Sequence, residues 1–216
     1  MSPQFVDFDA DGQLDIVAGT FDGSPHLARG SAKGWQQPEQ ILGRDGKRIV
    51  LDQFWNFDPK KWDRASRKGG EEFVLGGGHA TSAVAFDWDG DGDLDLLLGD
   101  HSSGQMHLRR NEGTRERPAF GTQNELVQAG GAPIDVPGTV ATLRVFDWNR
   151  DGRLDLLANG MGDAYANDEG GGVYLFLNTG TATATTFAAP TVLIERSRKG
   201  AAEALRPVRW SRRRGT

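Results

Sequence analysis

The sequence contains no cysteine and no long apolar run, and each absence excludes a class of protein. Without cysteine there is neither a disulfide framework nor a thiolate metal site. The longest apolar run is five residues, 173–177, whereas a membrane-spanning helix needs about 20. The four histidines (His26, His79, His101 and His107) are scattered, and none has a nucleophile at a motif spacing. The sequence therefore predicts no membrane span, no zinc site and no histidine-based catalysis.

Charge is divided unevenly along the chain. Residues 1–195 hold 17 basic and 29 acidic residues, a net charge of −12, whereas residues 196–216 hold eight basic residues and one acidic residue. An acidic body repels nucleic acid at long range, so we expect no nucleic-acid partner for it. The basic end lacks strand alternation and is expected to be a disordered tail. Contact of this tail with nucleic acid or another acidic surface is the minor alternative.

Three copies of one pattern recur in the sequence. They read FVDFDADGQLDIVAG from residue 5, AFDWDGDGDLDLLLG from residue 85 and VFDWNRDGRLDLLAN from residue 145. The first acids of the copies are Asp7, Asp87 and Asp147, spaced 80 and 60 residues apart. Repetition at such a period indicates a repeat architecture. We therefore divide the body, 1–195, into units at about 3–43, 79–127 and 139–195, with an insertion at 44–78.

Each unit reads as a small antiparallel sheet. The segments after the first acids of each pattern (14–18, 94–98 and 154–158) are five residues long and apolar apart from one aspartate. They are too short for helices and are expected to be strands buried on both faces. Segments 105–109 and 173–177 are expected to pair with them across polar turns. Glycine makes up 30 of 216 residues, about twice its usual share, as a turn-rich chain requires. The predicted fold class is all-β, with about four strands in each unit.

The acidic pattern has the spacing of a metal-binding loop. Counted from the first acid, positions 1, 3, 5 and 9 carry oxygen ligands and position 6 is always glycine, which permits the sharp reversal of the chain. Carboxylates packed this closely repel one another unless a cation joins them. The predicted ligands are Asp7, Asp9, Asp11 and Asp15 in the first copy, Asp87, Asp89, Asp91 and Asp95 in the second, and Asp147, Asn149, Asp151 and Asp155 in the third.

Oxygen-only ligands in a flexible loop favour Ca²⁺ over Mg²⁺, which prefers strict octahedral geometry. We expect up to three calcium ions, one per loop, each also bound by the backbone carbonyl at position 7. A helix-loop-helix calcium site would need glutamate at position 12, where this chain has Ala18, Leu98 and Ala158. The third loop should bind most weakly because Asn149 replaces an acid. For any single copy the alternative is a solvated acidic turn.

Residues 86–95, FDWDGDGDLD, with Asn111-Glu-Gly-Thr114 and their equivalents in the third unit, resemble the FG-GAP or VCBS repeat, the calcium-binding blade of integrin-α-type β-propellers. The resemblance covers about residues 3–43 and 79–195. It implies a β-propeller of four-stranded antiparallel blades with the ions in loops on one face. Propellers close with about four to eight blades. Three units therefore predict a partial propeller, either a fragment of a longer protein or a chain that pairs with another copy.

Proteins of this type are usually secreted or exposed on the cell surface and act in adhesion or recognition. The resemblance implies a non-catalytic module for extracellular or cell-surface recognition, with a protein or carbohydrate ligand and a secreted, periplasmic or cell-surface location. The chain shows no signal peptide, since Met1 leads directly into an expected strand at Phe5, so either it is cytoplasmic or its true start lies upstream. The alternative function is an accessory propeller domain of a secreted polysaccharide-acting or other hydrolytic enzyme.

Two segments fall outside the repeat. The insertion at 44–78 contains an expected hairpin turn at Asp45-Gly46 and four aromatic residues, Phe54, Trp55, Phe57 and Trp62. These aromatics either fill a small local core or form a binding surface for a sugar or peptide. The acids of loop 160–172 lack alternate spacing, so this loop is expected to be a solvated turn.

Overall fold

The computed structural model describes residues 3–65, 78–161, 171–181 and 183–196. Within these ranges every regular element is a strand, and all pairs of named strands are antiparallel. The all-β prediction is confirmed. Among the same residues there is no helix with the length and apolar character needed to cross a membrane.

Three four-stranded sheets form the body, and in each the strands follow one another in chain order. Sheet 1 contains β1 (Gln4–Val6), β2 (Asp15–Gly19), β3 (Pro25–Ala28) and β4 (Glu39–Gln40). Sheet 2 contains β7 (Ala80–Phe86), β8 (Asp95–Asp100), β9 (Met106–Arg109) and β10 (Glu125–Leu126). Sheet 3 contains β13 (Thr139–Phe146), β14 (Asp155–Met161), β15 (Val173–Phe176) and β16 (Thr191–Ile194). Two short hairpins are added, β5 (Gln53–Asn56) with β6 (Lys61–Arg64) and β11 (Gln128–Ala129) with β12 (Ala132–Pro133).

The register is the same at the start of all three sheets. Val6 pairs with Asp15, Phe86 with Asp95, and Phe146 with Asp155. The acid at position 9 of each sequence copy is therefore the first residue of the second strand, as expected from the apolar run that follows it.

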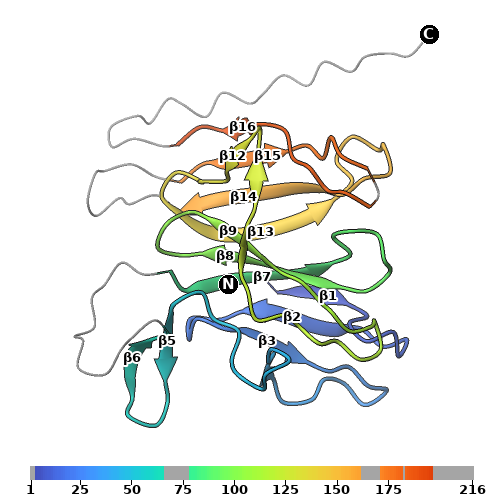
Figure 1. Cartoon of the computed structure of the whole chain (residues 1–216), viewed down its shortest axis with the longest axis vertical. Helices are drawn as coiled ribbons and strands as arrows, with labels where there is room; N and C mark the ends of the chain where they lie inside the picture. The colour runs from blue at the N-terminus through green and yellow to red at the C-terminus, as the bar shows by residue number, and fades with distance from the viewer. Residues whose placement is uncertain (1–2, 66–77, 162–170, 182, 197–216) are drawn as a thin grey trace.

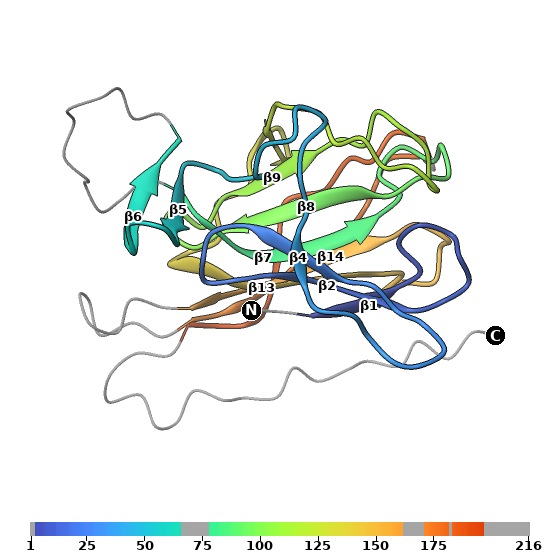
Figure 2. The ribbon, with the colours of Figure 1, turned by 90° about the horizontal axis from the view of Figure 1, so that it is seen from below.

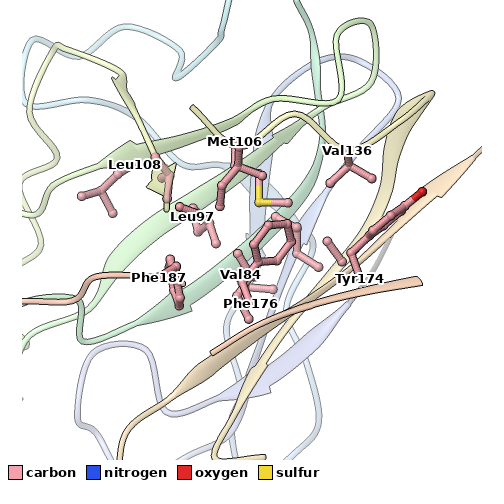
Figure 3. Close-up of a cluster of buried hydrophobic side chains, with 14 of the residues drawn as sticks. Val84, Leu97, Met106, Leu108, Val136, Tyr174, Phe176 and Phe187 are labelled. Atoms are coloured by element: carbon pink, nitrogen blue, oxygen red, sulfur yellow. The ribbon is translucent and has the colours of Figure 1, made fainter. Parts of the chain in front are cut away.

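The three sheets are stacked, with sheet 2 in the middle (Figure 1). Along β8 the side chains alternate between two cores, as the pleat of a strand requires. Leu96 and Leu98 belong to the core shared with sheet 1, whereas Leu97 belongs to the core shared with sheet 3 (Figure 3). All three leucines are fully buried, and burial of each such side chain contributes about 1.5–3 kcal/mol.

The expectation that all second strands are buried on both faces is correct only for sheet 2. Every residue of β8 is buried, whereas buried and half-buried residues alternate along β2. The leucine before each strand shows the same difference, because Leu94 is 6% exposed but Leu14 is 58% and Leu154 38% exposed. The physical reason is the stacking: sheet 2 has a neighbour on each face, and sheets 1 and 3 each have one within the described chain.

The contact between adjacent sheets is repeated along the stack. Phe8, from the first acidic loop, packs against Phe120 with ring centroids 6.0 Å apart, and the equivalent Trp88 packs against Phe187 at 5.9 Å. Each contact joins the loop of one sheet to the long connection of the next unit. The same arrangement therefore relates sheet 1 to sheet 2 and sheet 2 to sheet 3.

The insertion forms a turn and a hairpin. The turn at Asp45-Gly46 is present, with one antiparallel bridge between Leu42 and Arg48 instead of a strand pair. The β5–β6 hairpin, which was not predicted from the sequence, lies to the side of sheet 1, at the strand ends opposite the acidic loops (Figure 1, Figure 2). The predictions for the basic tail and for most of loop 160–172 fall outside the described residues.

Candidate metal centre

Each acidic segment joins the first strand of a sheet to the second. We call residues 7–15 loop 1, 87–95 loop 2 and 147–155 loop 3. The glycine at position 6 is left-handed in all three, with φ of +83° at Gly12, +94° at Gly92 and +86° at Gly152. A Cβ at these glycines would meet no atom within 4 Å, so glycine is needed for its backbone conformation and not for space.

Position 4 is left-handed as well, at Ala10, Gly90 and Arg150, with φ between +57° and +77°. The three loops therefore follow one backbone path even where the side chain disfavours it. A non-glycine residue held in this region is strained, and such strain persists only where the surrounding structure imposes it. In loops 1 and 2 several acidic side chains converge on this path.

The position-9 acids are structural anchors. Asp15, Asp95 and Asp155 are 2% exposed or less. One oxygen of Asp155 accepts the N–H of Trp148, inside loop 3, at 2.9 Å, and the other accepts the N–H of Asn178, after β15, at 2.8 Å. Asp15 and Asp95 make the equivalent pairs of hydrogen bonds. Each acid thus ties its loop to the end of the third strand of its sheet.

Two groups of carboxylates converge closely enough to share an ion. In loop 1 they are Asp7, Asp9 and Asp15, and in loop 2 they are Asp87, Asp89 and Asp91; within each group one ligand oxygen per residue lies within 4.8 Å of the others. Asp11 and Asp95, which were also predicted as ligands, are not in these groups. Asp11 is exposed and accepts the N–H of Gln13 at 2.7 Å.

An arginine holds the position-3 acid in loops 1 and 2. Arg29 donates to Oδ2 of Asp9, and Arg110 donates to Oδ2 of Asp89 at 2.9 Å. In both acids the other oxygen, Oδ1, is buried and has no hydrogen-bond partner. A buried charged oxygen without a partner is costly. The arrangement in both loops leaves the free oxygen available to a cation.

Loop 2 has a further acid that the spacing did not single out. Asp93, at position 7, is buried, and its Oδ1 has no hydrogen-bond partner. Burial and, to a smaller extent, the charges of Asp91, Asp89 and Asp87 together raise the pKa of Asp93 to about 6. Burial also raises the pKa of Asp95 to about 6, against the effect of its two N–H bonds. At neutral pH loop 2 therefore holds ionised carboxylates at a cost that a dication would offset.

Loop 3 satisfies more of its own polar atoms. Both oxygens of Asp147 accept backbone N–H bonds, at 3.0 Å from Asp151 and 2.9 Å from Gly152. Oδ1 of Asn149 accepts the N–H of Asp151 at 3.0 Å, and Arg153 forms an ion pair with the Asp151 carboxylate. With one carboxylate fewer and an arginine of its own, loop 3 has the weakest demand for a cation.

The residues of loops 1 and 2 fit a hard divalent ion. Their ligand atoms are oxygens, several are ionised, and two or more in each loop have no other partner. Such a donor set matches Ca²⁺, which accepts six to eight oxygen ligands in variable geometry. The predicted ligand assignment and the identity of the ion stay predictions.

The described chain is an all-β repeat with an acidic loop in each of three four-stranded sheets, and a family comparison agrees with this. Residues 87–158, which include loops 2 and 3, match the model of the FG-GAP-like repeat. This segment is therefore an FG-GAP-like repeat, and the predicted resemblance is confirmed over these residues. Comparisons with curated proteins and with solved structures gave no match.

Three residues of the site were missed from the sequence. Arg29 and Arg110 are the fourth residues of the matching segments HLAR and HLRR. The recurrence of arginine at this position is the sequence signal that could have identified them. Asp93 was assigned only a backbone carbonyl, because position 7 is not an acid in the other two copies.

Proposed function

We propose that this chain is a calcium-binding β-propeller segment that serves in extracellular or cell-surface recognition. The observation that carries the calcium assignment is the shared geometry of Asp9 and Asp89, in which an arginine holds one oxygen and the other is buried without a partner. Calcium would satisfy the free oxygens and neutralise the cluster. It would also join the exit of the first strand to the entry of the second.

The propeller assignment is supported by the repeated contact between sheets and by the apolar residues at one end of the stack. Phe5, Leu14 and Trp35 are more than half exposed on sheet 1. Ala85 and Leu94, at the positions equivalent to Phe5 and Leu14, are buried between sheets 1 and 2. We infer that a further sheet covers Phe5, Leu14 and Trp35, supplied by more sequence or by a second copy of the chain.

The recognition role, a protein or carbohydrate ligand, and a secreted or surface location are proposed from the resemblance to the family. We propose no catalytic role for the loop acids, because the position-9 carboxylates are each engaged by two N–H bonds and the position-3 acids by arginine. An accessory domain of a secreted hydrolase would use the same loops for stability.

Calcium titration of single-loop variants by isothermal calorimetry tests the assignment. Asp87→Ala removes a ligand from a loop with unpartnered carboxylate oxygens and should abolish one of the tighter binding events. Asp147→Ala should remove the weakest event and leave the two tighter events unchanged. Asp58→Ala, an exposed acid outside the loops, is the control and should bind calcium as the parent does. A greater loss of affinity in Asp147→Ala than in Asp87→Ala would contradict the ranking.

A further inference from the structure

A hollow of about 520 Å³ lies between the β2–β3 turn and the β5–β6 hairpin. Its walls include four aromatic rings, from Phe21 of the turn and from Trp55, Phe57 and Trp62 of the hairpin. It is at the opposite end of β2 from loop 1. The hollow and the candidate metal centre are therefore separate sites.

The rings stand as adjoining walls. Trp62 meets Phe21 with centroids 5.5 Å apart at an interplanar angle of 79°, and it meets Trp55 at 5.9 Å and 76°. Three consecutive rings therefore meet at nearly right angles, and all three line the hollow. The exposed ring of Phe57 lies in the same lining. We call these four rings the aromatic box; the face of an aromatic ring is negative and attracts positive charge.

The hairpin is held in place by hydrogen bonds that do not involve its rings. The N–H of Trp55 donates to the carbonyl of Asp22 at 2.8 Å, and Arg48 donates to the carbonyl of Trp55 at 2.8 Å. Gly23 allows this close approach, because a Cβ there would lie 2.5 Å from the carbonyl oxygen of Gln53. The box is therefore preformed, so a ligand need not spend binding energy on ordering it.

The polar side chains of the lining already have partners. The carboxylate of Asp22 accepts hydrogen bonds from the Ser24 N–H, Gln40 and Arg48. Thr20 donates to the same carboxylate. A sugar needs hydrogen-bonding groups for its hydroxyls, and few remain available here. The hollow instead suits a ligand with an apolar surface that makes no hydrogen bonds of its own.

The net charge of residues 1–195 favours a cation among such ligands. Among the described residues neither lysine nor arginine lines the hollow. Asp22 and His26 do, and the Asp22 carboxylate is paired with Arg48 at 3.1 Å and with His26 at 3.5 Å. His79, which packs behind Trp62 with centroids 5.1 Å apart, has its pKa lowered to about 4, chiefly by burial, so it is uncharged at neutral pH. The acidic body of the chain also attracts cations at long range.

We propose that this hollow binds a trimethylammonium group, such as that of choline or N-trimethyl-lysine. The positive charge of such an ion is spread over its three methyl groups. These groups are otherwise apolar and need no hydrogen-bond acceptor. Stacking of this charge on the faces of tryptophan and phenylalanine is a favourable cation–π interaction. This proposal rests on the hairpin and the β2–β3 turn alone and does not depend on calcium binding.

The test is a titration of the full chain, at saturating calcium, with choline and with its neutral isostere 3,3-dimethyl-1-butanol, followed by calorimetry or by NMR of the ligand methyl groups. We expect choline to bind more tightly than the isostere by roughly tenfold or more. Free N-trimethyl-lysine, titrated in parallel, should bind as well, and the tighter of the two cations indicates the source of the natural ligand.

Two variants separate binding from folding. Trp62→Ala removes the central wall and should abolish choline binding. Phe57→Ala removes an exposed ring without touching the hydrogen bonds of the hairpin, and it should weaken choline binding several-fold with an unchanged melting temperature. Trp35→Ala, outside the hollow, is the matched control and should bind as the parent does. Equal binding of the neutral isostere, no choline binding at millimolar concentration, or preferential binding of monosaccharides would each overturn the proposal.

Discussion

Replacing Asp155 by alanine is expected to destabilise the protein by about 2–6 kcal/mol even when no calcium is present. The carboxylate is fully buried and accepts two backbone N–H bonds, from Trp148 and Asn178. Alanine would leave both donors buried and unsatisfied, at about 1–3 kcal/mol each. Since domains are stable by only about 5–15 kcal/mol, this is a large fraction of the total. Urea unfolding in the presence of a chelator measures it.

Asp151→Ala is the matched control in the same loop. Asp151 is exposed, and its ion pair with Arg153 is at the surface, where such pairs contribute about 0–1 kcal/mol. The control should therefore unfold at nearly the urea concentration of the parent protein. Equal destabilisation by the two substitutions would show that Asp155 does not anchor the loop.

Removal of calcium is the second change with a large expected effect. An ion present at a hundredfold excess over its dissociation constant stabilises the folded state by about 2.7 kcal/mol per site. For a chain of this size, 1 kcal/mol corresponds to about 2–4 °C in melting temperature. Chelation should thus lower the melting temperature by about 5–10 °C for each occupied loop. Scanning fluorimetry with calcium, magnesium and chelator measures the shift.

Two further conditions give this experiment its specificity. Magnesium should restore much less of the lost stability than calcium, because it prefers octahedral sites with retained waters. The double variant Asp7→Ala/Asp87→Ala should lose most of the response to calcium, while the Asp58→Ala control should keep it. A melting temperature that does not change with chelator would mean that the ions add nothing to folding.

The sequence predicted the acidic loops because their geometry is local. The alternation of acids and the glycine at position 6 lie within nine residues, and the left-handed φ of Gly12, Gly92 and Gly152 confirms the role assigned to that glycine. Ala10 and Arg150 adopt the same left-handed conformation at position 4. Their side chains gave no sign of it, because the surrounding loop imposes this strain.

Features that depend on contacts between distant parts of the chain could not be predicted from the sequence. Arg29 reaches Asp9 from the end of β3, 20 residues away, so the pairing depends on the sheet. Leu94 and Leu14 have the same place in the repeat, yet only Leu94 has a neighbouring sheet to bury it. The repeat sequence alone predicts neither the pairing of Arg29 with Asp9 nor the different burial of the two leucines. The walls of the aromatic hollow likewise combine the insertion with Phe21 of the β2–β3 turn.

The most direct test of the central claim is a count of the calcium ions bound to the full chain. Native mass spectrometry or atomic emission, after dialysis against buffered calcium, gives this number without assumptions about stability. Our account predicts two ions that persist at micromolar calcium, in loops 1 and 2, and a third in loop 3 that appears only at higher concentration. A chain that retains no calcium at millimolar concentration would contradict it.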